Sequence, residues 1–310
     1  MNYEFSKITM EIKTISDSQK KYFQKIDSLD LELLIAHTLE KPREFVLAHP
    51  KYALTRDQEL RIENYAKQRL NNEPLAYIIG HKEFFGLDFK INKNTLIPRP
   101  ETEQLVELAI QEIKNKSQKS IIIDVGTGSG CIIISIAKNN KQRAMNDVKF
   151  YATDISSEAL KIAKQNATAH GVEKKIKFLR GNLLAPLIGN WKLEIGNSRM
   201  IILANLPYLS KEIYNSTSPD VKNFEPKSAL VSAHAGLAHY EKLFKQLKKF
   251  PAANCKLSII LEFSPEQKPL LKKIIPKYFP KAEIKFHKDL CGLWRICKIN
   301  ILSSRKNPLF

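Results

Sequence analysis

The segment from residue 120 to residue 138 constrains the fold more than any other part of this chain. Residues 120–125, Ser-Ile-Ile-Ile-Asp-Val, are rich in the β-branched side chains typical of buried strands. They run into Gly-Thr-Gly-Ser-Gly at 126–130, and the apolar run 131–138 follows. Glycines let the backbone turn sharply and approach a ligand closely. The sequence therefore predicts a strand, a ligand-binding turn and a buried helix in succession.

The spacing of the three glycines narrows the class of ligand. Gly126, Gly128 and Gly130 follow the pattern G-x-G-x-G, whereas dinucleotide-binding turns typically follow G-x-G-x-x-G. No Gly-Lys-Ser or Gly-Lys-Thr accompanies them, which excludes a P-loop. Taken alone, the turn is also compatible with an ordinary connection between a strand and a helix.

Two more predicted strands end in polar side chains. Residues 148–153 run into Asp154, and residues 176–179 are followed closely by Asn182. A carboxylate at the second strand end can accept hydrogen bonds from both hydroxyls of a ribose. An amide at the third strand end can face the edge of an adenine. The three strand ends together therefore predict a nucleoside site.

A fourth predicted strand, residues 200–204, runs into the tetrapeptide Asn205-Leu206-Pro207-Tyr208. Asn and Pro interrupt strands, and Pro holds the preceding residue extended. The tetrapeptide therefore forms a stiff corner, residues 205–208, at the end of the strand. This corner carries a side-chain amide oxygen, a backbone carbonyl outside the hydrogen bonds of the sheet, and an aromatic ring. Two acceptors beside a ring suit a planar NH2 group, such as an amide or an adenine amine.

In this order, the segments resemble the S-adenosylmethionine-dependent methyltransferases of the Rossmann-like class. Residues 73–80, 84–87 and 96–103 are similar, more narrowly, to the family that methylates the glutamine of peptide-chain release factors, called PrmC or HemK. The resemblance runs from about residue 28 to about residue 300. Further positions that match the family are Phe224-Glu225-Pro226, Gly236-Leu237, Tyr240, Glu262, Gln267 and Asp289-x-x-Gly292-x-x-Arg295.

The resemblance implies an α/β fold with a doubly wound, mostly parallel, seven-stranded sheet and a small N-terminal helical domain. It implies an enzyme that uses S-adenosylmethionine to methylate the side-chain amide of glutamine in the Gly-Gly-Gln motif of release factors. The chain departs from the family at Leu206, where Pro is usual, and at Asn182, where Asp is common. Leu keeps the carbonyl and Asn keeps an acceptor, so we expect the activity to survive.

We expect the cofactor to lie at the carboxyl edge of the sheet. The corner would accept both N–H bonds of the substrate amide through Asn205 and the Leu206 carbonyl, with Pro207 and Tyr208 packed on its faces. No metal ligand is expected. The residues predicted to contact the cofactor are Gly126, Thr127, Gly128, Ser129, Gly130, Asp154, Asn182, Leu183 and Asn205.

Four regions are predicted along the chain. Residues 1–85 form a helical domain that, by the family resemblance, docks the substrate; residues 86–97 form a β-hairpin linker. Residues 98–302 form the methyltransferase domain, and 303–310 form a tail. The class resemblance implies that the last two strands, near 283–287 and 293–301, pair antiparallel.

The composition sets limits on the partners and the compartment. The formal net charge is +18, which is compatible with ribosome or RNA contact and with an acidic protein partner. No apolar run approaches the roughly 18 residues of a membrane span. The four cysteines are dispersed without a C-x-x-C pair, as expected of a protein in the reducing cytoplasm. We expect a monomer.

Two other functions are compatible with parts of the sequence. An adenine methyltransferase acting on rRNA or DNA is one, because Asn-Leu-Pro-Tyr also occurs in rRNA adenine dimethyltransferases and the chain is basic. A non-catalytic binding module that keeps the fold is the other. Residues 73–102 and 224–226 favour the glutamine family, and the intact glycine turn and tetrapeptide favour an enzyme.

Overall fold

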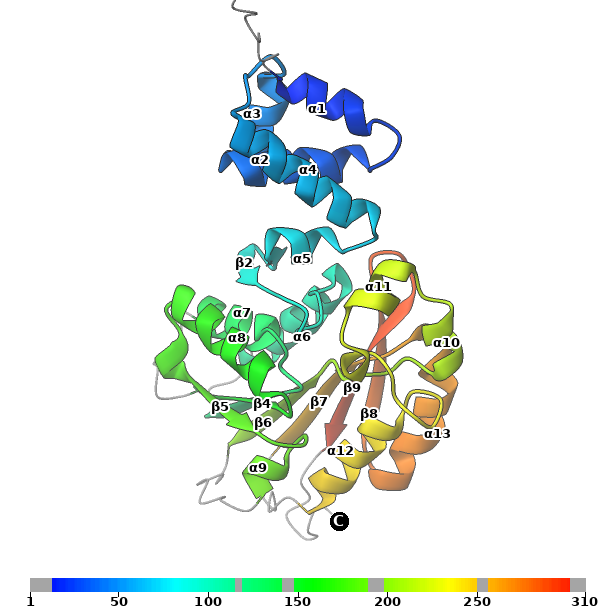
Figure 1. Cartoon of the computed structure of the whole chain (residues 1–310). Helices are drawn as coiled ribbons and strands as arrows, with labels where there is room; N and C mark the ends of the chain where they lie inside the picture. Colours follow the sequence, from blue (N-terminus) through cyan, green and yellow to red (C-terminus); the bar gives the residue numbers. More distant parts are fainter. Residues whose placement is uncertain (1–12, 115–118, 141–147, 189–197, 250–255, 302–310) are drawn as a thin grey trace, which may run out of the picture. The chain divides into compact units, whose positions relative to one another are not determined.

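The computed structural model describes residues 13–114, 119–140, 148–188, 198–249 and 256–301. The chain forms two compact units that divide after Gly80 (Figure 1). Each unit has hydrophobic core residues of its own. The predicted tail and Cys255 lie outside the described residues.

The first unit is helical. Thr14, Asp27 and Thr55 cap three of its helices by accepting backbone N–H bonds, and Thr55 forms a capping box with Gln58. Apolar side chains at helical spacing, such as Ile35 on α2 and Ile62 on α4, meet in its core. Its helices are α1 (Ile15–Tyr22), α2 (Ser28–Leu39), α3 (Arg43–Ala48), α4 (Arg56–Leu70) and α5 (Leu75–Ile79).

The second unit contains a seven-stranded sheet with the order β5-β4-β3-β6-β7-β9-β8. The first five of these strands are parallel, and β9 runs antiparallel between β7 and β8. The predicted mostly parallel sheet and the antiparallel pairing of the last two strands are confirmed. The strands are β3 (Ser120–Val125), β4 (Val148–Asp154), β5 (Ile176–Arg180), β6 (Arg199–Ala204), β7 (Lys256–Glu262), β8 (Glu283–Lys288) and β9 (Trp294–Ile301).

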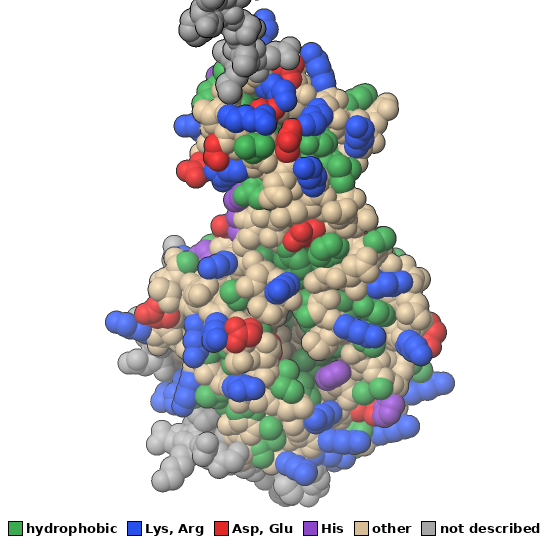
Figure 2. Space-filling model, in the orientation of Figure 1, with side chains coloured by type: hydrophobic (Ala, Val, Ile, Leu, Met, Phe, Trp, Pro, Cys, Tyr) green, Lys and Arg blue, Asp and Glu red, His purple; other side chains and the backbone are tan. Residues whose placement is uncertain are grey.

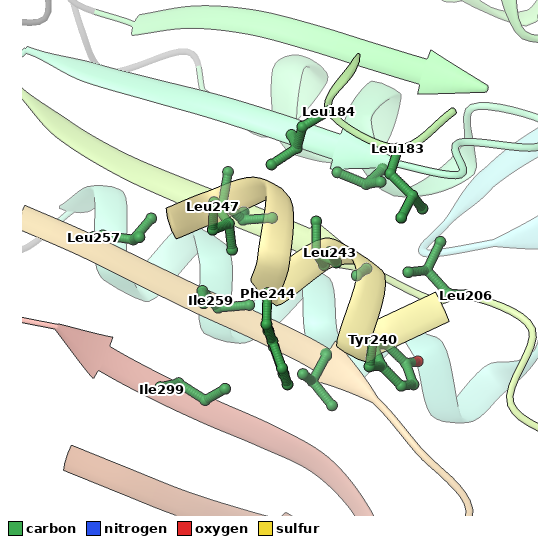
Figure 3. Close-up of a cluster of buried hydrophobic side chains, with 14 of the residues drawn as sticks. Leu183, Leu184, Leu206, Tyr240, Leu243, Phe244, Leu247, Leu257, Ile259 and Ile299 are labelled. Carbon is green, nitrogen blue, oxygen red and sulfur yellow. The ribbon is translucent and has the colours of Figure 1, made fainter. Parts of the chain in front are cut away.

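Helices cover both faces of this sheet. Because side chains alternate along a strand, Ile122 of β3 points into one hydrophobic cluster, and Ile121 and Ile123 point into another. The cluster of Ile122 includes side chains of α6 (Glu103–Lys114), α7 (Cys131–Asn139) and α8 (Ser157–Ala169). The other cluster, drawn in Figure 3, includes side chains of α12 (Ala238–Lys248) and α13 (Lys268–Tyr278).

The strand order reverses at β3, the first strand of the sheet in the chain. The strands β4 and β5 lie on one side of β3 in the sheet, and β6 and β7 lie on its other side. In open α/β sheets, ligands bind outside the carboxyl ends of the strands at such a switch point. The glycine turn directly after β3 therefore lies where the fold class places a ligand.

A short antiparallel pair, β1 (His81–Phe84) and β2 (Leu87–Lys90), opens the second unit. It begins ahead of the segment 86–97 because Gly80, with φ 80°, ends α5 in the left-handed conformation. The buried Asn166 of α8 fixes the pair, since its side chain bonds both the N–H and the carbonyl of Lys90. The same side chain donates to the Ser129 carbonyl at 2.8 Å, which ties the pair to the glycine turn.

Short helices fill the connections of the second unit. The sequence did not predict the three that follow the tetrapeptide, α10 (Lys211–Asn215), α11 (Pro219–Phe224) and η3 (Lys227–Ala229). None of the helices within the described ranges combines the length and the apolar character that a membrane crossing requires. The remaining short helices are η1 (Pro100–Thr102), η2 (Glu173–Lys175), α9 (Ala185–Ile188) and η4 (Pro265–Gln267).

Candidate active site

A cavity of about 310 Å³ opens at the carboxyl edge of the sheet. The ends of β3, β4 and β6 and the segment after β5 all contribute to its wall. The predicted site residues that line it are Gly126, Thr127, Gly128, Ser129, Asp154, Asn182, Leu183, Asn205, Leu206 and Pro207. Two predicted residues do not line it: Gly130 lies behind the turn as the N-cap of α7, and Tyr208 points toward the buried end of β7.

The glycine turn is compact. The N–H groups of Gly126 and Thr127 both donate to the Thr153 carbonyl, at 2.8 and 3.0 Å, which folds the turn against β4. Gly126 has φ +74°, and a Cβ there would lie 2.8 Å from Cδ2 of Leu206. Gly128 has φ +56°, and a Cβ there would meet no atom within 4 Å. The first glycine allows close packing, and the second leaves open space on the cavity wall.

Asp154 joins the turns after β3 and β4. Its Oδ2 accepts a hydrogen bond from Gly128 N at 2.9 Å, and its Oδ1 accepts one from Ser156 N at 2.8 Å. Burial raises the pKa of Asp154, while these backbone hydrogen bonds act in the opposite direction. The carboxylate is therefore held in a fixed orientation on the cavity wall.

Behind the turn lies Asp124, a fully buried residue of β3. Its Oδ2 accepts a hydrogen bond from Thr127 Oγ1 at 2.6 Å. Burial raises the pKa of Asp124 to about 7, and the charge of Asp154 adds to the shift. Sequence reasoning treated Asp124 only as part of a strand, although a carboxylate within an apolar run is itself a signal.

The backbone of Asn182 and the segment after it are held by Gln246 of α12. Its amide nitrogen donates to the Asn182 carbonyl at 3.2 Å, and its amide oxygen accepts from Leu184 N at 2.8 Å. Leu183 between them is buried and has φ 56°. Gln246 was missed in the sequence because nothing local connects it to residue 182.

The corner 205–208 is anchored by Gln267. Its Nε2 donates to the carbonyls of Tyr208 and Ala235, at 2.7 and 2.9 Å. Gly236 lies so close that a Cβ there would be 1.9 Å from the Tyr208 carbonyl oxygen. Only glycine fits this contact, so Gly236 and Gln267 together hold the backbone of the corner at Tyr208.

Side-chain hydrogen bonds fix the polar groups of the corner. Asn205 Nδ2 donates to Thr102 Oγ1 at 3.1 Å, and Tyr208 Oη donates to Glu262 Oε1 at 2.9 Å. Burial, together with the neighbouring Glu262 carboxylate, raises the pKa of Tyr208 well above its usual value. Tyr208 therefore stays a neutral phenol at physiological pH.

An ion pair joins two segments at the rim of the cavity. Arg99 pairs with Glu225, whose other carboxylate oxygen accepts a hydrogen bond from Ile97 N at 3.2 Å. The Glu225 side chain is 1% exposed. The segments 96–103 and 224–226 were singled out separately in the sequence, and the structure brings them together.

Comparison with known proteins follows the two units. Residues 19–80 match the PrmC N-terminal domain, and residues 116–216 match a methyltransferase domain. A release factor glutamine methyltransferase of Nitratidesulfovibrio vulgaris is 34% identical over 268 residues, which cover 86% of each chain. One of Bacillus anthracis is 32% identical over 84% of this chain and 88% of the relative.

This chain belongs to the release factor glutamine methyltransferase family. The resemblance of its sequence to that family is confirmed, and the chain is an S-adenosylmethionine-dependent methyltransferase. Part of a longer rickettsial protein, named bifunctional methyltransferase, is also similar, at 30% identity over 90% of this chain and 52% of the relative.

The family fold extends to a distant solved structure. The catalytic domain of hMettl16, in complex with a MAT2A 3'UTR hairpin, superposes with a TM-score of 0.50 at 17% identity. The match covers 82% of this chain and 83% of that one. At this identity the likeness concerns the fold alone.

The structure adds residues of the cavity wall that the sequence did not indicate. Among them is His239 of α12, which lines the cavity and hydrogen-bonds Ser232 Oγ through Nδ1 at 2.8 Å. Burial lowers the pKa of His239, so the ring is neutral at pH 7. The rest of the cavity wall is formed by residues 93–99, Thr102, Cys131, Ile132, Ile155, Ser156, Ala159, Gly181, Pro226, Ser228 and Ala229.

Proposed function

We propose that this protein methylates the side-chain amide nitrogen of glutamine in the Gly-Gly-Gln motif of peptide-chain release factors. The observation that carries the proposal is the position of the corner: Asn205, Leu206 and Pro207 line the same cavity as the glycine turn and Asp154. A planar amide on the corner and a cofactor on the strand ends would therefore meet in one space. The relatives named release factor glutamine methyltransferase support the choice of substrate.

Asp154 would hold the ribose, and Asn182 and Leu183 would face the adenine. Asp154 suits its role because its orientation is fixed by two backbone N–H groups, which leaves the remaining lone pairs of its oxygens for hydroxyl donors. Gly128 would face the methionine part, where its missing side chain leaves space. S-adenosylmethionine, when bound, supplies an electrophilic methyl group on a sulfonium.

Asn205 Oδ1 and the Leu206 carbonyl would accept the two N–H bonds of the substrate amide. An amide nitrogen is a poor nucleophile because its lone pair is delocalised. Two oriented acceptors turn that lone pair toward the donor and stabilise the positive charge that grows on nitrogen. Pro207, on the cavity wall, would pack on a flat face of the amide, and Tyr208 would support the corner from behind through its hydrogen bond to Glu262.

Leu206 is compatible with this role. Its carbonyl is retained, and its side chain, 3% exposed, fills space against Gly126. The Leu206 backbone also lowers the pKa of the Tyr240 phenol, against the larger effect of burial. Leu206 is thus integrated into the second unit, although Pro is usual at this position in the family.

The helical first unit would dock the release factor. It matches the PrmC N-terminal domain over residues 19–80, and none of the cavity residues belongs to it. A protein that begins at His81 should bind S-adenosylmethionine like the full chain but methylate an intact release factor much more slowly. A full rate from the shortened protein would contradict docking by the first unit.

Contact with the ribosome or RNA, the monomeric state and the cytoplasmic location stay predictions. Lys and Arg side chains are spread over the visible face of the second unit and do not gather in one patch (Figure 2). A spread positive charge favours general attraction to acidic partners over a defined nucleic-acid track.

The decisive experiment offers the enzyme three substrates in parallel. Purified protein is incubated with methyl-labelled S-adenosylmethionine and a release factor, the same factor with its Gly-Gly-Gln glutamine replaced by alanine, or rRNA. We expect label in the first sample alone. Label on adenine in the third sample, with none in the first, would overturn the proposal in favour of an adenine methyltransferase.

A further inference from the structure

A buried carboxylate connects the two polar side chains of the corner. Glu262, the last residue of β7, is 1% exposed. Its Oε2 accepts a hydrogen bond from Thr102 Oγ1 at 2.6 Å, and its Oε1 accepts one from Tyr208 Oη at 2.9 Å. Thr102 Oγ1 in turn accepts from Asn205 Nδ2 at 3.1 Å. Thr102, also 2% exposed, therefore links Glu262 to Asn205.

The direction of these hydrogen bonds follows from an ionised Glu262 carboxylate, the form that the bonds from Thr102 and Tyr208 favour. An ionised carboxylate can only accept, whereas a hydroxyl has a single hydrogen to donate. Thr102 therefore gives its hydrogen to Glu262 and must accept from Asn205. Asn205 can donate to Thr102 only through its NH2 group. The oxygen of the same side-chain amide then faces the opposite side, toward the cavity that Asn205 lines.

The opposite orientation of Asn205 would be unproductive. The substrate amide presents an NH2 group, and a second NH2 group facing it offers no acceptor. Both orientations of a side-chain amide fill nearly the same volume, so packing alone does not select one of them. The hydrogen bonds from Thr102 to Glu262 and from Asn205 to Thr102 select the orientation in which the Asn205 oxygen faces the cavity.

We propose that Glu262 is a positioning residue for methyl transfer, acting through Thr102 to aim the Asn205 oxygen at the substrate nitrogen and acting directly to hold the Tyr208 hydroxyl. The inference rests on the proposed function and deepens it, because Glu262 acts without touching substrate or cofactor.

Several neighbours hold Glu262 in place and oppose the effect of its burial. Tyr240 Oη donates to the backbone carbonyl of Glu262, which fixes the strand end. Burial raises the pKa of Glu262, whereas the hydrogen bonds from Thr102 and Tyr208 and the charge of Arg295 favour the ionised form. Arg295 is held in turn by Asp289, with Nε 3.2 Å from Oδ2.

Glu262→Gln is the most direct test because it keeps the shape of the side chain. It replaces a carboxylate, which only accepts hydrogen bonds, with an amide, which also donates them. If the new amide presents its oxygen to Thr102, its NH2 group meets Tyr208 Oη and the tyrosine must turn its hydrogen elsewhere. If it presents its NH2 group to Thr102, the hydroxyl must donate to Asn205, and Asn205 turns its oxygen away from the cavity. Either arrangement disturbs one side chain of the corner.

The variant should therefore lose turnover without losing cofactor. We expect kcat on a release factor to fall at least about tenfold, since one oriented acceptor is typically worth about a hundredfold in rate. The Kd of S-adenosylmethionine, measured by calorimetry, should stay within the error of the parent. Thr102→Val removes the connecting hydroxyl without changing the charge, and it should likewise lower kcat without changing the Kd of S-adenosylmethionine. Thr102→Ser keeps a hydroxyl and should restore most of the turnover.

Ser258→Ala is the matched control on the same strand. Ser258 is a buried residue of β7 whose hydroxyl bonds Arg199 and Asn300, away from the corner. Its loss should lower the thermal midpoint but leave kcat unchanged. A parental kcat in Glu262→Gln and Thr102→Val would overturn the inference, as would a loss matched by Ser258→Ala. If Glu262→Gln does not fold, Thr102→Val decides. A parent enzyme that leaves the release-factor glutamine unlabelled would instead overturn the proposed function itself.

Discussion

The Leu206 side chain packs directly against the backbone of Gly126: a Cβ at residue 126 would lie 2.8 Å from Leu206 Cδ2. The first residue of the glycine turn and the second residue of the corner are thus in van der Waals contact, although 80 positions separate 126 from 206. A change on either side of this contact is expected to reach the other.

Gly126→Ala should impair both the fold and the cavity. The substitution forces a side chain into the left-handed region, at a cost of about 1–2 kcal/mol, and adds the contact with Leu206. Gly171→Ala is the matched control, since Gly171 has φ +67° with no atom within 4 Å of a Cβ. Urea unfolding should show a larger loss for Gly126→Ala, and calorimetry should show weaker S-adenosylmethionine binding in that variant alone. Equal losses in both variants would contradict the role of the contact.

Asp154→Ala should weaken binding of S-adenosylmethionine. A carboxylate that accepts bonds from two hydroxyls contributes about 1.5–3 kcal/mol for each charge-assisted hydrogen bond. The substitution also frees the N–H groups of Gly128 and Ser156, so the turn itself loosens. Asp154→Asn keeps the shape and one acceptor, and it should lie between the parent and Asp154→Ala in a calorimetric titration. Unchanged affinity in both variants would refute the ribose assignment.

Local patterns carried the prediction of the fold and the cofactor edge. Asp154 and Asn205 each follow an apolar strand, and the carboxyl ends of parallel strands share one edge of a sheet, so alternation of strands and helices was enough to bring them together. The glycines after β3 were recognisable for the same local reason.

The support of the corner could not be derived from local patterns. Thr102 and Glu262 are separated by 160 positions, and Tyr208 and Glu262 by 54. Their contact depends on the register of β7 beside β6 and on the exact position of η1, neither of which leaves a periodic trace in the sequence. Family resemblance singled out these positions without showing that they touch.

Leu206→Pro illustrates what the structure adds. The sequence predicts near-normal activity, because Pro keeps the carbonyl and restores the usual family residue. The structure shows that Leu206 is 3% exposed and that its side chain packs against Gly126. Losing buried apolar contacts costs about 1–3 kcal/mol. We therefore expect a lower thermal midpoint in scanning calorimetry with kcat largely retained at 25 °C. A midpoint equal to that of the parent would show that Pro fits without loss.

Asp124 should make the stability depend on pH. Its pKa is raised from 3.8 to about 7 by burial, so the folded state holds a proton that the unfolded state releases. The stabilising effect of this proton is complete below about pH 4 and is lost as the pH rises through about 7. Asp124→Asn keeps an acceptor for Thr127 and removes the titration. Urea unfolding between pH 5 and pH 8 should therefore show a steeper loss of stability in the parent, and parallel curves would contradict the raised pKa.

Asn205→Ala should separate catalysis from cofactor binding. The substitution removes one of the two acceptors that we propose for the N–H bonds of the substrate amide, and losing one preorganised group typically costs about a hundredfold in rate. It also leaves Thr102 without its donor, while the bonds from Thr102 and Tyr208 to Glu262 can persist. We expect kcat on a release factor to fall by about that factor, with the Kd of S-adenosylmethionine changed much less. Single-turnover labelling and calorimetry on the same preparation measure the two quantities together. A variant that loses cofactor affinity in proportion to its rate would show that Asn205 acts mainly on the cofactor, and the acceptor for the substrate amide would then have to be another group on the cavity wall.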